Sequence, residues 1–152
     1  MPRWYGAAGF ARSVAGTLGT VLTEIDHVAI AVNDLEAAVD YYRSVYGVEV
    51  EHREVVEHDG VEEALVKVAD SYVQLLTPVR ADSPVAKFLA DHGEGVHHVA
   101  YRVDSCADAL DRVRAQGGRL VDTEPRPGSR GTTVAFVHPD GAFGTLVELV
   151  EE

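Results

Sequence analysis

Four side chains with metal-ligand chemistry occupy equivalent positions in two halves of this sequence that resemble each other. The segment DHVAIAVNDLEAAVDYYRS aligns with HHVAYRVDSCADALDRVRA, which places His27 over His98, 71 positions later. The VQL of YVQLL aligns with the VEL of TLVEL, which places Gln74 over Glu148, 74 positions later. The two offsets differ by three residues, which one loop can absorb. Each half therefore supplies one imidazole and one oxygen donor, as a four-ligand metal site across a pseudo-twofold axis would require.

Two imidazoles, an amide oxygen and a carboxylate suit a borderline or hard divalent cation that keeps open positions for a substrate. A structural zinc site would be closed and would more often contain thiolates. Any one of these residues by itself would more often be an ordinary core or surface residue. The joint pattern of four donors in two equivalent pairs predicts a metal role for His27, Gln74, His98 and Glu148.

Apolar periodicity and turn residues predict the same order of elements in each half, namely strand, helix and three further strands. In the first half we expect these elements at 25–32, 35–46, 48–56, 63–68 and 72–77. In the second half we expect them at 98–103, 107–115, 119–122, 132–137 and 145–150. The predicted fold class is α+β, with paired βαβββ modules that form an open, curved, mixed sheet, helices outside and a trough inside.

The alternation of side chains within the predicted strands places the candidate ligands in that trough. Successive side chains of a strand point to opposite faces of the sheet. His27 therefore lies opposite the apolar face of Val28 and Ile30, which suits packing against a helix. Gln74 and Glu148 each stand between two large apolar neighbours, and so point away from the core by the same rule.

Length and composition bound the class of protein. At 152 residues and 46% hydrophobic content, the chain is long enough for one domain. A formal net charge of −12 argues against a nucleic-acid partner. The halves contain no apolar stretch long enough for a transmembrane helix, so we expect no membrane partner. The single Cys106 excludes an intrachain disulfide and fits a reducing, cytoplasmic location.

The first 23 residues differ in composition from the rest, because they hold two arginines, no acidic residue and many small residues. We interpret 1–23 as a flexible N-terminal extension outside the functional unit. Arg12 interrupts the apolar run and argues against a signal peptide, whereas a transit-type segment stays open as an alternative. Residues 24–152 are the predicted domain, in which a linker helix at 79–95 joins module one (24–78) to module two (96–152).

The segments DHVAIAV, GVHHVAYRV and GTLVELVE resemble the vicinal oxygen chelate, or glyoxalase, superfamily. YVQLL, SPVAKFLADHGEGVHHVAYRV and RPGSRGTTVAFVHP are similar to the methylmalonyl-CoA epimerase family within it, over residues 25–151. The resemblance implies a cofactor of Co²⁺, Mn²⁺, Ni²⁺ or Zn²⁺, an acyl-CoA thioester substrate and a homodimer. The ligands it implies are His27, Gln74, His98 and Glu148, with His97 on the opposite face as a structural residue.

The same resemblance implies epimerisation at carbon two of methylmalonyl-CoA, by removal of the α-proton through a metal-stabilised enolate. The family pattern has a glutamate three residues after the glycine of a hairpin, which corresponds here to Glu63, counted from Gly60. The residues themselves do not separate Glu63 from Glu62, although only one of them can face the trough. Glu148 is the implied second acid/base group as well as a metal ligand.

Three alternatives share this fold. A glyoxalase I-like lyase has the same four-ligand layout, but usually carries Glu at the position of Gln74. An extradiol dioxygenase would use two histidines and one glutamate, and would leave Gln74 unexplained. A non-catalytic small-molecule-binding protein would lack the metal ligands, so the full set of four argues for an enzyme. Arg130 is expected in a flexible loop, and Cys106 as a small helix residue.

Overall fold

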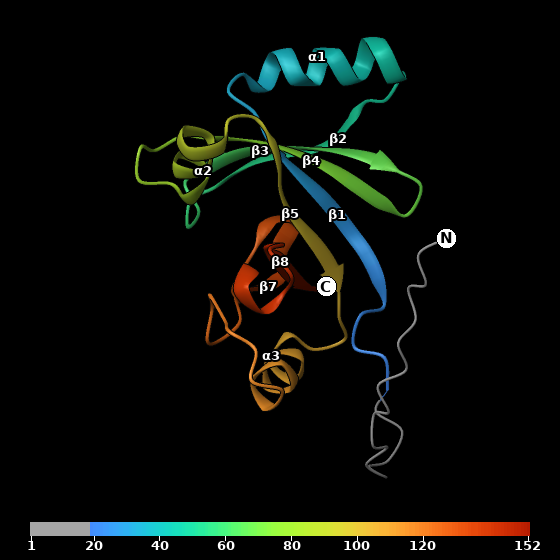
Figure 1. Ribbon diagram of the computed structural model, residues 1–152. Helices are drawn as coiled ribbons and strands as arrows, with labels where there is room; N and C mark the ends of the chain where they lie inside the picture. The colour runs from blue at the N-terminus through green and yellow to red at the C-terminus, as the bar shows by residue number, and fades with distance from the viewer. Residues whose placement is uncertain (1–18) are drawn as a thin grey trace, which may run out of the picture.

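The computed structural model describes residues 19–152, whose strands form one curved mixed sheet with the order β2-β3-β4-β1-β5-β8-β7-β6 (Figure 1). The strands are β1 (Glu24–Ala31), β2 (Val50–Val56), β3 (Val61–Val68), β4 (Ser71–Pro78), β5 (Gly95–Arg102), β6 (Arg126–Pro127), β7 (Thr133–Val137) and β8 (Val147–Glu151). The helices are α1 (Leu35–Tyr46), α2 (Pro84–His92) and α3 (Cys106–Ala115), with short 3₁₀ turns η1 (Ser129–Gly131) and η2 (Pro139–Gly141).

The two halves of the sheet have the same topology and meet at an antiparallel pair. β1 pairs with β5 at the centre, and each also pairs in parallel with the last strand of its own half, β4 or β8. One helix covers the outer face of each half, α1 on the first and α3 on the second (Figure 1). The predicted α+β fold of paired modules is therefore confirmed.

The helix boundaries follow the predicted capping residues. The side chain of Asp34 accepts a hydrogen bond from the amide of Ala37 at the start of α1, and Gly47 ends this helix with a φ of 67°. The Ser105 side chain begins α3 in the same way. The buried faces of α1 and α3 pack on one face of the sheet. The other face holds the trough, and α2 covers part of it at Ala29, Ala31 and Leu76.

The predicted strand at 119–122 is wrong. Leu120 forms only an isolated bridge with Val137, and the edge strand β6 forms later, at Arg126–Pro127. The backbone amide of Phe136 donates a hydrogen bond to the side chain of Asp122. In a regular strand pair this amide would donate to a backbone carbonyl of the neighbouring strand. The edge strand of the second half, β6, is therefore shorter than β2, the edge strand of the first half.

Two β-bulges interrupt the central pair at equivalent positions. In the register of β1 with β5, Ile25 faces Tyr101 and His27 faces Ala100, so Asp26 is left unpaired. Farther along, Ala29 faces His98 and Ile30 faces Val96, so His97 is left unpaired. A bulge adds one residue to a strand and re-aims its side chain. His27 and His98, the two candidate ligand histidines, are therefore each preceded by a bulged residue.

The N-terminal segment is described only from residue 19. The amide of Thr23 donates to the carbonyl of Arg102, and Arg112 donates to the carbonyl of Gly19, so the last residues before β1 contact module two. The flexibility predicted for 1–18 lies outside the described residues. Within 19–152, none of the helices has the length and apolar character needed to span a membrane.

Candidate metal centre

Three donor atoms from β1, β5 and β8 meet on the inner face of the sheet. His27 Nε2 lies 3.1 Å from His98 Nε2, and Glu148 Oε2 lies 3.0 Å and 2.9 Å from these two nitrogens. All three residues are buried. Adjacent ligands of an octahedral cation at about 2.1 Å stand roughly 3.0 Å apart. The triad therefore has the spacing of one face of a coordination shell.

The arrangement of hydrogens in this triad requires a proton or a cation between His27 Nε2 and the carboxylate of Glu148. His27 Nδ1 lies 2.6 Å from Asp26 Oδ2, and an ionised carboxylate can only accept, so Nδ1 carries the hydrogen. In the neutral ring, Nε2 then presents a lone pair to the carboxylate of Glu148. Two acceptors at that distance repel unless a proton or a cation lies between them, so the donor set fits a divalent cation.

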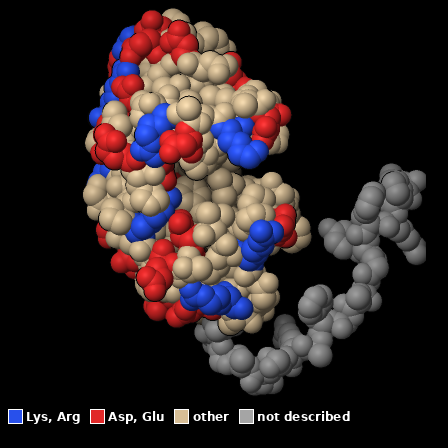
Figure 2. Space-filling view, turned by 90° about the vertical axis from the view of Figure 1, so that its left-hand side faces the viewer, with Lys and Arg blue, Asp and Glu red and all other residues tan. Residues whose placement is uncertain are grey.

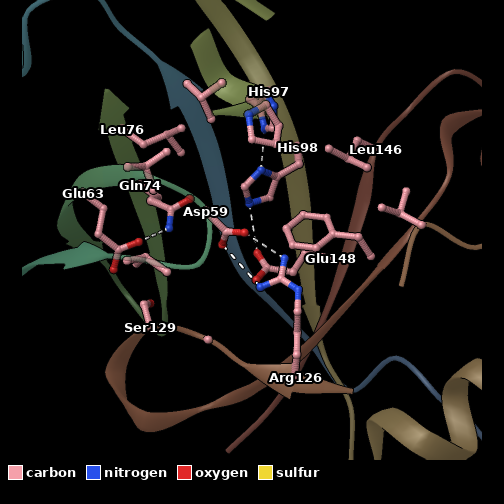
Figure 3. A pocket seen from close by; sticks show the side chains of 17 residues that line it. Asp59, Glu63, Gln74, Leu76, His97, His98, Arg126, Ser129, Leu146 and Glu148 are labelled. Carbon is pink, nitrogen blue, oxygen red and sulfur yellow. Dashed lines mark hydrogen bonds and ion pairs between the residues drawn. The ribbon is translucent and has the colours of Figure 1, made fainter. Parts of the chain in front are cut away.

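Gln74, the fourth predicted ligand, lines the same pocket as His98 and Glu148. Its Nε2 donates to Oε2 of Glu63, and its buried Oε1 has no hydrogen-bond partner (Figure 3). Buried amide oxygens are almost always satisfied in folded proteins. The unpartnered oxygen is therefore available as a ligand atom, as the sequence predicts for this residue.

Glu63 and Glu62 have opposite surroundings. Glu63 is 1% exposed and lines the pocket, and burial raises the pKa of its carboxyl group. Glu62 lies on the other face of β3, where it accepts a hydrogen bond from Arg53 Nε at 2.9 Å. Strand geometry thus separates two neighbours that the sequence left unresolved, and it is Glu63 that points into the trough.

The interpretation of His97 as a residue of the opposite face is wrong. His97 lines the pocket, and its Nδ1 lies 2.9 Å from Nδ1 of His98 (Figure 3). Burial, with His98 beside it, lowers the pKa of His97 to about 4, so the ring is neutral and can accept the Nδ1 hydrogen of His98. Strict alternation fails here because His97 occupies the bulge of β5.

Asp26 is a site residue that the sequence reasoning missed. It is fully buried and accepts hydrogen bonds from Arg102 Nε at 2.8 Å and from the Arg130 guanidinium at 2.6 Å, as well as from His27. Burial opposes its ionisation, but these partners lower the pKa of Asp26 to about 2. A charged residue within the apolar strand IDHVAIAV was the available signal.

Arg130 is held by three contacts, and the expectation of a flexible connection is wrong. Besides its ion pair with Asp26, its guanidinium lies 5.0 Å from the centre of the Tyr72 ring, and its amide donates to Glu54 at 2.6 Å. The loop around η1 therefore ties module two to module one across the trough. Cys106 is buried, and burial raises its thiol pKa to about 11, as befits a structural residue.

A second cationic side chain lies at the edge of the pocket. Arg126 pairs with Asp59, from the turn between β2 and β3, at 3.0 Å (Figure 3). Its guanidinium also lies 5.4 Å from the centre of the Phe136 ring. This ion pair is a second link between the modules, because Asp59 lies between β2 and β3 and Arg126 lies in β6.

Comparison with known proteins identifies the class first. Residues 26–136 match the model of the Glyoxalase/Bleomycin resistance protein/Dioxygenase superfamily, and the chain belongs to it. A structure of methylmalonyl-CoA epimerase in complex with methylmalonyl-CoA and NH₄⁺ is 47% identical, with a TM-score of 0.83, and the match covers 86% of this chain and 95% of that one. Within the superfamily, this chain belongs to the methylmalonyl-CoA epimerases.

Two further relatives have comparable coverage. The ethylmalonyl-CoA/methylmalonyl-CoA epimerase of Cereibacter sphaeroides is 37% identical over 131 residues, which are 85% of this chain and 98% of that protein. The crystal structure of methylmalonyl-CoA epimerase from Mycobacterium tuberculosis is 38% identical, with a TM-score of 0.83, and the match covers 90% of this chain and 93% of that one. The similarity therefore extends over nearly the whole length of the relatives.

Binding of a divalent cation is expected to release about one proton at pH 7. Burial opposes a charged ring at His27, but the hydrogen bonds with Asp26 and Glu148 outweigh it and raise the pKa of His27 to about 9. A cation must displace that proton, so its apparent affinity should rise about tenfold per pH unit up to about pH 9. His98, whose pKa burial lowers, contributes no proton at pH 7.

The proton count is measured by calorimetric titration of the cation-free protein in buffers of different ionisation enthalpy. The His58→Ala variant, in which an exposed imidazole outside the triad is removed, should release the same number. Binding without proton release would show that His27 is neutral before the cation arrives.

Proposed function

We propose that this protein interconverts the two epimers of methylmalonyl-CoA by removing and returning the proton at carbon two, with a divalent cation held by His27, Gln74, His98 and Glu148. The observation that carries the proposal is the buried triad of donor atoms with a separate buried carboxylate, Glu63, in the same pocket. A related epimerase was solved in complex with methylmalonyl-CoA, which supports the choice of substrate.

The difficulty of the reaction is the negative charge that develops when a weakly acidic α-proton leaves. A bound divalent cation with open positions supplies Lewis-acid stabilisation for that charge. The chain itself supplies a pocket with apolar side chains such as Leu76, Val85 and Phe136 in its lining. Exclusion of water strengthens the electrostatic interactions within the site.

Glu63 is the proposed base that takes the proton. Burial raises its pKa, which brings it closer to the pH at which a general base is most effective. Gln74 donates to its carboxylate through Nε2 while its Oε1 stays free for the cation. One amide side chain would thus set the position of the base relative to the bound substrate.

Glu148 is the proposed second acid/base group, on the opposite side of the pocket. Although burial opposes it, hydrogen bonds with His27 and His98 hold the pKa of Glu148 well below its usual range. The pKa of Glu63 is shifted in the opposite direction. Two carboxyl groups whose environments separate their pKa values are the usual arrangement for distinct acid and base roles.

The substrate is an anion and the chain has a net charge of −12. On the face shown in Figure 2, basic side chains are interspersed with acidic ones, and none of the drawn basic residues forms a broad patch. We therefore propose that the attraction comes from the cation and from single arginines near the pocket, such as Arg126. The homodimer and the cytoplasmic location stay predictions.

The test is deuterium uptake at carbon two of methylmalonyl-CoA in heavy water. The cation-loaded protein should catalyse rapid exchange, and chelation should abolish it, because the enolate then loses its stabilising charge. Exchange is followed by NMR or mass spectrometry, and readdition of the cation is the control. Absence of exchange in fully loaded protein would refute the epimerase assignment.

A glyoxalase I-like activity is the second candidate. The lactoylglutathione lyase of Neisseria meningitidis is 32% identical over 117 residues, which are 76% of this chain and 83% of that protein. The discriminating assay offers the same loaded protein the hemithioacetal of glutathione and methylglyoxal. We expect no turnover of this substrate.

A further inference from the structure

A second group of potential ligands lies beside Glu63 on the inner face of the sheet. His52 and Glu54 alternate on β2, so their side chains share one face. Glu54 pairs in register with Glu63 of β3, and His52 pairs with Leu65. One ligand atom from each of His52, Glu54 and Glu63 lies within 4.8 Å of the other two. The cluster therefore offers one imidazole and two carboxylates to a common point.

Two polar atoms of this cluster are buried without hydrogen-bond partners. One is Oε1 of Glu63, whose side chain is 1% exposed, and the other is Nε2 of His52. The His52 Nε2 atom lies 3.1 Å from Glu54 Oε1, without the geometry of a hydrogen bond. Buried atoms of this kind cost free energy unless something satisfies them. The Glu63 carboxylate uses its other oxygen for Gln74, so its free oxygen is available here.

The charges of the cluster also favour a cation. Burial raises the pKa of Glu63, and repulsion by the Glu54 carboxylate acts in the same direction. The amide of Arg130 donates to Glu54 Oε1 at 2.6 Å, which fixes that side chain without cancelling its charge. The side chains of His52 and Glu54 are 36% and 34% exposed, so the cluster lies close to solvent although its His52 Nε2 atom is buried.

We propose that His52, Glu54 and Glu63 form a second divalent-cation site, separate from the triad of His27, His98 and Glu148, and that a cation bound there inhibits the enzyme. Ligands of tetrahedral zinc, at about 2.0–2.1 Å, stand roughly 3.3 Å apart, close to the spacing of the His52 and Glu54 donor atoms. Zn²⁺ is the expected occupant because it accepts mixed nitrogen and oxygen ligands. The inhibition, but not the binding, rests on the proposed function, in which Glu63 is the base.

The inhibitory effect follows from the double use of one carboxylate. A carboxylate bound to a cation has its lone pairs engaged and can no longer take the substrate proton. Occupation of the second site should therefore lower the exchange rate at carbon two by about 100-fold or more, the range of a general base. Occupation of the first site alone should leave the rate at its maximum.

The experiment titrates cation-free protein with Zn²⁺ and measures bound metal by equilibrium dialysis and exchange at carbon two in parallel. We expect two Zn²⁺ per chain in the wild type, with exchange rising at the first equivalent and falling at the second. The His52→Asn variant should bind one Zn²⁺, keep full exchange at one equivalent and resist excess Zn²⁺. The matched control is His58→Asn, which changes an exposed histidine of the following turn and should behave as the wild type.

Each outcome decides the proposal. One Zn²⁺ per chain in the wild type, or undiminished inhibition of His52→Asn by excess Zn²⁺, would overturn it. If one equivalent of metal gives no exchange, the proposed function fails, but the difference in stoichiometry between wild type and His52→Asn still reports the second site. Glu54→Gln is the second variant, since its amide oxygen can still accept from Arg130, and it should also lose the second Zn²⁺. Circular dichroism and thermal unfolding would be used to check that both variants are folded.

Discussion

Replacement of Glu63 by Gln is expected to slow deuterium exchange at carbon two by a factor of about 10²–10⁴, the usual contribution of a general base. Bound metal in the first site should stay at one per chain. Glutamine has nearly the same shape and can still accept the hydrogen bond from Gln74, so the pocket should keep its form. The loss would then belong to the proton transfer and not to the binding of the cation.

The matched control is Glu62→Gln on the same strand. Glu62 faces away from the pocket and pairs with Arg53, and exposed ion pairs of this kind contribute little. We expect an exchange rate within about twofold of the wild type, since such surface changes are small in free energy. A large loss in Glu62→Gln with little effect in Glu63→Gln would reverse the assignment of the base.

The pH profile gives an independent view of the same residue. Burial raises the pKa of Glu63, and only the ionised form can take a proton. The rate of the loaded wild type should therefore fall as the pH drops through this raised pKa, at a higher pH than for an ordinary glutamate. In Glu63→Gln the residual rate should lack this acid limb.

Replacement of His98 by Ala is expected to abolish both cation binding and exchange. His98 supplies one of three donor atoms that lie about 3 Å from one another, and its loss leaves two of them. At a cation concentration that fills only the first site of the wild type, dialysis should leave the variant nearly metal-free, and its exchange rate should equal that of the chelated wild type. His58→Ala, at an exposed position, should retain the metal and the rate.

Thermal unfolding provides a readout of the same site that does not depend on activity. A cation that binds only the folded chain stabilises it by about 4 kcal/mol when its free concentration is 1,000 times the dissociation constant. At a cation concentration that fills only the first site, a chelator should therefore lower the melting temperature of the wild type and leave that of His98→Ala unchanged. Equal sensitivity of the two proteins to the chelator would place the cation somewhere other than the triad.

Much of this architecture is determined by the sequence itself. The internal repeat predicts the two equivalent modules, because each half carries the apolar periods and the capping residues of the same elements. The repeat also brings His27 over His98 and Gln74 over Glu148, and strand alternation places all four on the inner face. The fold and the placement of these side chains could be predicted because they depend on local periodicity, and on pairs of residues related by a single duplication.

Other features depend on pairing between strands that are far apart in the chain. The alternation rule cannot locate the bulges at Asp26 and His97, because a bulge exists only relative to the partner strand 71 positions away. For the same reason the sequence did not reveal that Asp26 and His97 support the two ligand histidines. Arg130 was missed because its partners Asp26, Tyr72 and Glu54 all lie in the other module.

The choice between Glu62 and Glu63 belongs to the same category. Both carboxylates follow the same turn, and the direction of each side chain is decided by the register of β3 with β2 and β4. The strand predicted at 119–122 does not form, because the side chain of Asp122 accepts the hydrogen bond of the Phe136 amide. This contact also depends on a distant segment. The sequence alone predicts the modules and the candidate ligands. The tertiary structure decides which neighbours orient those side chains, because a side chain's direction depends on pairing between distant segments.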